Sequence, residues 1–190
     1  MSPDSSGGTP QSALADFHEN APSFGAWLAV LIVCGFGLRL ALVFGAESSL
    51  DCDESTVALM SLDILEQGVR PMFFYGGAYN GGGALEAYLG AVAIALGASP
   101  AFGLKCVVAL LWLGAATLFA NLCQRSLPRT QAVIAVLFLV IGTPFFLEWS
   151  VKARGGFSET LLFSVVLLWL AHPPPALKPR PTLQCILFGL

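Results

Sequence analysis

Charge is scarce in this sequence. Only 11% of its 190 residues are charged, whereas 56% are hydrophobic. A soluble domain of this size exposes much of its surface to water and could not hide so many apolar side chains. The composition therefore indicates an integral membrane protein. The net charge of −3 provides no basic surface, so nucleic-acid binding has no support.

Two further patterns are missing. The five cysteines are scattered, odd in number and lack CxxC or CxH spacing, so no disulfide framework or zinc site is expected. The first 24 residues are rich in Ser, Gly and Pro, and they contain no basic segment ahead of a short apolar stretch. This argues against a cleaved signal peptide. It predicts a disordered cytoplasmic tail, residues 1–24, ahead of a membrane span that is retained.

Long apolar runs fill most of the remaining chain. They approach or reach the roughly 20 residues that a helix needs to cross a bilayer. The sequence predicts four spans: residues 25–45, 103–123, 132–149 and 157–171. Residues 183–190 look like the start of a fifth, so we expect an all-α polytopic helical bundle over residues 25–190. Pro144 predicts a kink or an end in the third span.

Arg39 interrupts the first span about two turns before its end. A long cationic side chain at that depth either snorkels to the interface or faces other helices. The sequence alone leaves both alternatives open.

Basic residues in short loops set the orientation of the spans. Arg125 and Arg129 lie between the second and third spans, and Lys178 and Arg180 follow the fourth. Placing both loops in the cytoplasm also places the N-terminus there. Residues 46–102 and 150–156 then face outward, toward the periplasm or the cell exterior. The pattern predicts a multi-pass protein of the inner (plasma) membrane.

The outward loop of residues 46–102 contains two helical patterns. Residues 54–67 have apolar side chains at helical spacing, with Asp53 placed to cap the start and Gly68 to end the helix. A helix of this kind beside a span lies in the interface plane. Residues 84–97 are apolar but short, which favours an interfacial segment. A true crossing is the alternative, and it would invert the later loops.

Polar side chains of the outward loops gather on one side of the membrane. The candidates for chemistry are Asp53, Glu54, Tyr75, Tyr79, Asn80, Glu86, Glu148, Lys152, Arg154 and Glu159. Simpler explanations exist, because carboxylates cap helices, tyrosines gather at membrane interfaces and basic side chains contact lipid phosphates. These explanations do not account for the presence of all the groups on one face.

Glycosyl transfer from a lipid-linked sugar would use all of these groups. A carboxylate can take the proton of an attacking hydroxyl, and basic side chains can hold the phosphate leaving group. Tyrosine and asparagine suit a sugar, which offers hydroxyl groups and a CH face. The lipid tail of the donor would keep it at the interface.

Four segments follow an order that resembles the polytopic glycosyltransferases of the GT-C fold class: "LRLALVF", "DCDESTVALMSLDILEQG", "RPMFFYGGAYNGGGALEAYLGAVAIALGAS" and "ARGGFSETLLF". The resemblance is closest to the bacterial dolichyl-phosphate-mannose-protein-mannosyltransferase-like and RgtA/B/C/D-like group. It implies that Asp53 is the catalytic base and that Glu54 is its partner or a metal ligand. Tyr75, Tyr79 and Glu86 match the group's YGxxYxGxxExYL pattern.

The same resemblance implies a polyprenyl-phosphate-linked sugar as donor and an outward-facing lipid, glycan or protein as acceptor. From the chemistry of the loop we expect Lys152 or Arg154 to contact the donor phosphate. The other implied substrate-binding residues are Tyr75, Tyr79, Asn80, Glu86 and Glu159. No cofactor is certain, and a divalent metal is left open. Members of this class usually have more spans, so we expect the N-terminal part of such an enzyme, which could be an inactive fragment.

Two other classes of protein remain as alternatives. A transporter or flippase subunit needs ionisable groups near the middle of the bilayer, or broken helices facing one another. Arg39 is the one charge that we place well inside a span, which ranks this class second. A small structural membrane protein without a site of its own ranks third.

Overall fold

The computed structural model of this chain describes residues 23–45, 49–75 and 84–172. Within these ranges the regular secondary structure consists of α-helices, without any β-strand. They are α2 (Phe24–Gly45), α3 (Cys52–Glu66), α4 (Ala84–Ala95), α5 (Pro100–Ser126), α6 (Arg129–Ile141), α7 (Pro144–Trp149) and α8 (Phe157–Ala171). The all-α prediction is confirmed for these residues. The expected N-terminal tail, apart from residues 23 and 24, and the expected start of a fifth span lie outside them.

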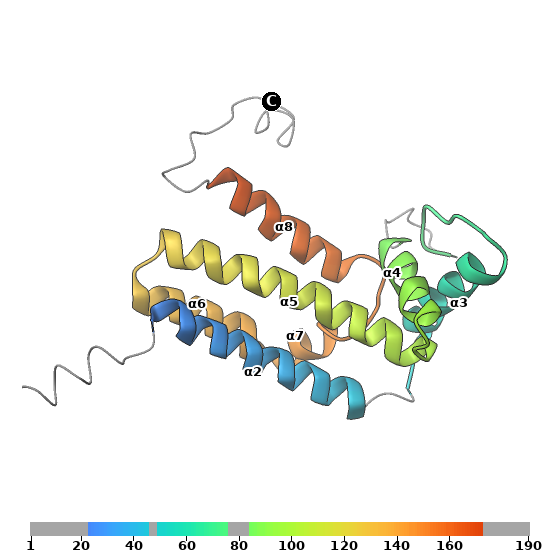
Figure 1. Cartoon of the computed structure of the whole chain (residues 1–190), viewed down its shortest axis with the longest axis horizontal. Helices are drawn as coiled ribbons and strands as arrows, with labels where there is room; N and C mark the ends of the chain where they lie inside the picture. Colours follow the sequence, from blue (N-terminus) through green and yellow to red (C-terminus); the bar gives the residue numbers. More distant parts are fainter. Residues whose placement is uncertain (1–22, 46–48, 76–83, 173–190) are drawn as a thin grey trace, which may run out of the picture.

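Helix α5 is central to the bundle and packs against α2, α6 and α8 (Figure 1). The chain runs out along α2, back along α5, out again along α6 and back along α8. Helices α3 and α4 lie together at one end of α5, and the connection from α7 to α8 lies at that same end. The two loops predicted to share one face therefore lie at one end of the bundle, with the α5–α6 turn at the other.

Two helices, α2 and α5, are long and apolar enough to cross a membrane by length and composition, with 22 and 27 residues. Helices α6 and α8 are apolar but shorter, with 13 and 15 residues. The third predicted span is broken, because Gly142 has a positive φ of 58° and Pro144 starts a new helix. The break expected at Pro144 is thus confirmed. Two of the four expected spans coincide with candidate crossing helices in the described residues, and a bundle of four spans is not confirmed.

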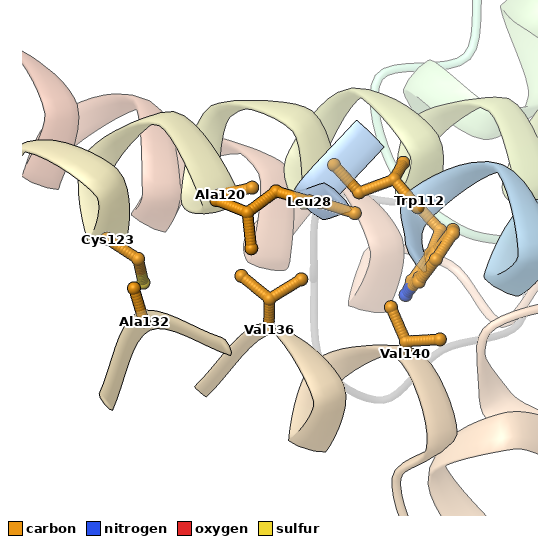
Figure 2. Packing of buried hydrophobic residues seen from close by; sticks show 9 residues of the cluster. Leu28, Trp112, Ala120, Cys123, Ala132, Val136 and Val140 are labelled. Atoms are coloured by element: carbon orange, nitrogen blue, oxygen red, sulfur yellow. The ribbon is translucent and has the colours of Figure 1, made fainter. Parts of the chain in front are cut away.

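An apolar core lies between α2, α5 and α6. Figure 2 shows Leu28, Trp112, Val136 and Val140 gathered between the three helices. A Cβ atom on Gly35 would lie 2.8 Å from Val140 Cγ1 and 2.9 Å from a ring carbon of Trp112. Gly35 therefore allows α2 to approach both other helices closely.

Arg39 is fully buried beside this core. Its Nη1 donates hydrogen bonds to the backbone oxygens of Gly35 and Val140, at 3.0 and 3.1 Å. Its guanidinium carbon lies 3.4 Å from the ring centre of Trp112. The carbonyl groups in the last turn of a helix have no partner within that helix. Arg39 therefore faces other helices rather than the interface, and it caps the end of α6 just before the break.

A second core joins α3 and α4 to α5. Its buried side chains are Val57, Ala58, Met60, Ala87, Leu104, Val108 and Ala153. The packing is close at Gly90, where a Cβ atom would lie 2.5 Å from Leu104 Cδ2. Helix α4 has 12 residues and is therefore about 18 Å long, well short of the roughly 30 Å of a bilayer core. The interfacial interpretation of residues 84–97 is favoured over a crossing.

Candidate active site

The start of α3 arranges the acidic residues of the first loop predicted to face outward. Asp51 is the N-cap: its Oδ1 accepts a 3.0 Å hydrogen bond from the Glu54 backbone N–H, and Glu54 Oε2 accepts a 3.1 Å bond from the Asp51 N–H. The prediction that Asp53 caps the helix is wrong, because α3 begins at Cys52 and Asp53 lies within its first turn. The D-x-x-E spacing of a capping box was the signal for the correct cap.

Glu54 is also held by a cation from another helix. Lys105 Nζ lies 3.0 Å from Glu54 Oε1 and 3.3 Å from Oε2, and both side chains are almost fully buried. With both oxygens engaged, Glu54 acts here as a structural group. Lys105 is the residue that sequence reasoning missed, and it is a second buried charge in a predicted span, besides Arg39. Its signal was a lysine within an apolar helix, where a charge usually has a specific partner.

The loop between α7 and α8 supplies the basic side chains. Arg154 Nη2 binds Asp51 Oδ2 at 2.7 Å, and Arg154 Nη1 lies 3.9 Å from Asp53 Oδ2. Lys152 Nζ lies 3.5 Å from Asp51 Oδ2 and 2.6 Å from Glu148 Oε1. The structure thus brings the acids of the first loop into contact with the basic residues of the second. We call these five residues the charge cluster.

Asp51 holds the charge cluster together. Burial raises the pKa of its carboxyl group, but the Glu54 N–H and the charges of Arg154 and Lys152 outweigh that effect, so the pKa lies below its usual value. Arg154 also packs over the ring of Trp149, with 4.6 Å between the guanidinium carbon and the ring centre. Asp51 is therefore negatively charged at neutral pH and fixes the position of both cations.

Two buried glutamates tie α4 to the same loop. The Gly155 N–H donates to Glu86 Oε2, and the Glu86 N–H donates to Glu159 Oε1, each at 2.9 Å. Among the residues that the structure describes, no donor reaches Glu86 Oε1 or Glu159 Oε2. Burial raises the pKa of Glu86, and the neighbouring Glu159 raises it further, to about 7. Two predicted site residues thus meet in the interior, apart from the charge cluster.

The Tyr/Gly segment, which follows α3, is described only in part. Tyr75 is partly buried and packs against the second core. Tyr79 and Asn80 lie outside the described residues, so their role in sugar binding stays a prediction.

An apolar groove of about 450 Å³ opens beside the charge cluster. Its lining includes Leu38 and Leu42 from α2, Pro144 and Leu147 from α7, and Lys152 from the loop. The break before α7 therefore shapes one wall of the groove. Apolar walls with a few charged groups suit a ligand that has an apolar chain and an anionic end.

The carboxylates of the charge cluster make a poor metal site. Within the described ranges, no three side chains of His, Cys, Asp or Glu lie together in a way that could hold a metal ion. Glu54, the expected ligand, is paired with Lys105, and Asp51 is paired with Arg154. We therefore assign no step of the chemistry below to a metal.

Comparison with known proteins identifies no family for this chain. No family model, no curated protein and no solved structure matches this chain. The resemblance to GT-C glycosyltransferases therefore rests on the segments of this sequence alone.

Proposed function

We propose that this chain is, or is part of, a membrane glycosyltransferase of the GT-C class. It would transfer a sugar from a polyprenyl-phosphate-linked donor to an acceptor on the outward side of the inner membrane. The observation that carries this proposal is a half-exposed carboxylate beside a cation of the loop that also lines an apolar groove. Asp53 lies next to Arg154, and Lys152 of the same loop lines the groove.

Of the three acids at the start of α3, Asp53 has the most freedom to act as a base. Asp51 caps the helix and binds Arg154, and Glu54 is buried against Lys105. Asp53 is 52% exposed and makes only a long 3.9 Å contact with Arg154, so an acceptor hydroxyl can approach its carboxylate from the solvent side. A general base must come within hydrogen-bond reach of the proton that it removes. Access therefore favours Asp53 over its two neighbours.

In the proposed reaction, Asp53 takes the proton of the acceptor hydroxyl while the hydroxyl oxygen bonds to the anomeric carbon of the sugar. The bond between that carbon and the donor phosphate breaks, and polyprenyl phosphate leaves with the electron pair. Lys152 and Arg154 stabilise the negative charge that develops on the phosphate. The apolar tail of the donor lies along Leu38, Leu42 and their neighbours in the groove.

The proposal requires the α3–α4 end of the bundle to face outward. Helices α2 and α5 would cross the membrane, and α6 with α7, followed by α8, would complete four crossings. The alternating direction of these helices supports that arrangement. Arg125 and Arg129, near the α5–α6 turn, would then face the cytoplasm, as the positive-inside rule expects.

The substitution Asp53→Asn in the intact enzyme tests this proposal. It preserves size and removes the base, so sugar transfer from a polyprenyl-phosphate donor should fall by about 100-fold or more at unchanged membrane expression. Glu66→Gln is the matched control, because Glu66 is an exposed acid at the far end of α3. That variant should transfer sugar at the wild-type rate. Wild-type turnover in Asp53→Asn would contradict the assignment of Asp53 as the general base.

The broken helix makes a transporter or flippase subunit the second candidate. Such proteins place ionisable groups and helix breaks in the middle of the membrane, and Arg39 bonds to α6 just before its break. Its contacts with Gly35, Val140 and Trp112 indicate a structural role, which ranks this function second. Donor-lipid translocation in proteoliposomes that Asp53→Asn leaves unchanged would favour it over transfer.

A further inference from the structure

We propose that Glu86 and Glu159 bind one proton, which their carboxyl groups share, and that this proton latches α4 to the loop of residues 150–156. We call the two glutamates and the proton the latch. The inference rests on the proposed function only where it concerns regulation, because the loop carries the cations assigned to the donor phosphate. The latch itself does not depend on that function.

The latch sits where three segments meet: the start of α4, the end of the loop and the start of α8. Glu86 accepts the Gly155 N–H, and Glu159 accepts the Glu86 N–H. Glu86 has no exposed surface, and Glu159 is 5% exposed. Gly155 has a φ of 67°, which favours glycine and aims its N–H at Glu86. Each carboxyl group therefore uses one oxygen to hold the junction closed.

The second oxygen of each group needs a proton or a cation. Glu86 Oε1 and Glu159 Oε2 have no donor in the described part of the chain, yet Glu159 Oε1 lies 2.9 Å from the Glu86 backbone nitrogen, and the negative charge of Glu159 is close enough to raise the pKa of Glu86. Two buried carboxylates without a donor between them repel each other and lose their hydration. One proton converts one group into a donor to the other, which removes both costs.

The neighbouring cations are engaged elsewhere. Lys105 on α5 pairs with Glu54 of α3, and the loop residues Lys152 and Arg154 both pair with Asp51. The other charged groups on α3, α5 and α7 are Asp53, Asp63, Glu66, Arg125 and Glu148. Arg125 packs over Trp169 near the opposite end of α5, and the rest are acids. Arg70, in the segment that follows α3, is exposed to solvent. A shared proton is therefore the simplest source of the missing positive charge.

Loss of the proton would release the junction. The pKa of Glu86 is raised, so its protonated form persists from acid up to about pH 7 and is lost as the pH rises further. Two facing negative charges would then weaken both backbone contacts. Arg154 directly precedes Gly155, so release would move the side chain that binds Asp51 and approaches Asp53. Under the proposed function, outward pH thereby regulates the phosphate contacts.

Infrared difference spectroscopy of the full chain in detergent micelles tests for the proton. The C=O band of a buried, protonated carboxyl group should be present at about pH 6 and largely lost at about pH 8. Glu86→Gln and Glu159→Gln should each remove this band, whereas the control Glu66→Gln should keep it. A band that survives both latch substitutions would overturn the proposal.

Limited trypsin cleavage after Lys152 and Arg154 tests the latch. Measured against cleavage after Arg125, it should rise about tenfold between about pH 6 and 8, because the deprotonated fraction of a group with a pKa of about 7 rises by that factor. The glutamine amide in Glu86→Gln offers a hydrogen-bond donor and an acceptor at every pH, so this variant should stay protected from trypsin at both pH values. Glu86→Ala has neither and should be cleaved at both.

Two results would contradict the latch. One is wild-type pH dependence in Glu86→Gln. The other is protection that depends on added Mg²⁺ instead of on pH, which would indicate a bound cation. Neither readout requires transfer activity, so Asp53→Asn should keep both the band and the pH-dependent protection. Failure of the latch is thereby distinguishable from failure of the proposed function.

Discussion

Lys105 and Glu54 form a buried ion pair that joins α5 to α3, with 3.0 Å between Nζ and Oε1. The same carboxylate accepts the Asp51 N–H, so one side chain connects α5 to the first turn of α3. The charge cluster is therefore anchored on a candidate membrane-crossing helix and does not depend on loop contacts alone.

Lys105→Met should be strongly destabilising. It leaves Glu54 buried without its cation, which should lower the free energy of unfolding by about 3–5 kcal/mol. The double variant Lys105→Met, Glu54→Gln should recover much of that loss, because no charge stays buried and glutamine preserves the capping box. Thermal unfolding in detergent, followed by circular dichroism, measures both. Equal losses in the single and double variants would show that the ion pair is not the cause.

Gly90→Ala should loosen the packing of α3 and α4 on α5. The new Cβ atom would lie 2.5 Å from Leu104 Cδ2 and 2.6 Å from Ser61 Oγ, so about 1–3 kcal/mol of stability should be lost. Gly37→Ala is the control, because no atom lies within 4 Å of its Cβ position in α2. That change should be neutral or stabilising by up to about 1 kcal/mol. The same unfolding measurement distinguishes them, and similar effects would contradict the packing argument.

Asp51 should make the free energy of unfolding decrease at acidic pH. Its native pKa lies below the usual value of 3.8, so its contribution is complete above that value and is lost as the pH falls through the native pKa. Asp51→Asn keeps a good cap but removes the charge, so it should flatten the acid end of the stability profile. Unfolding measured between about pH 7 and 3 tests this. The control Glu66→Gln should follow the wild-type profile, and a steep acid limb in Asp51→Asn would refute the assignment.

The local features of the fold were predictable from sequence. Apolar periodicity located the helices, Gly68 marked the end of α3 with its φ of 65°, and Pro144 marked the break after α6. These signals act within a few residues, so they require no knowledge of tertiary contacts. The two loops predicted to lie together do contact each other, since Arg154 binds Asp51.

The partners of buried charges were less predictable. Hydropathy places Arg39 and Lys105 in apolar helices, but it does not show which neighbouring helix each side chain meets. Arg39 bonds to α6, which is distant in sequence, and Lys105 bonds to the start of α3. The contact between Glu86 and Glu159 likewise depends on how the loop returns to α4. Tertiary packing decides which partner each buried charge meets, so these contacts can be identified only in the three-dimensional structure.

Asp51 Oδ2 lies between Arg154 and Lys152, the two cations that would hold the donor phosphate under the proposed function. Before a donor binds, the Asp51 carboxylate thus supplies the negative charge that the donor phosphate would otherwise provide. Donor binding would be an exchange of one anion for another, and the two cations would never be left without a counter-charge. Because Asp51 Oδ1 caps α3, the displaced carboxylate would stay tethered at the helix start. It could then return to the cations as soon as the product phosphate leaves.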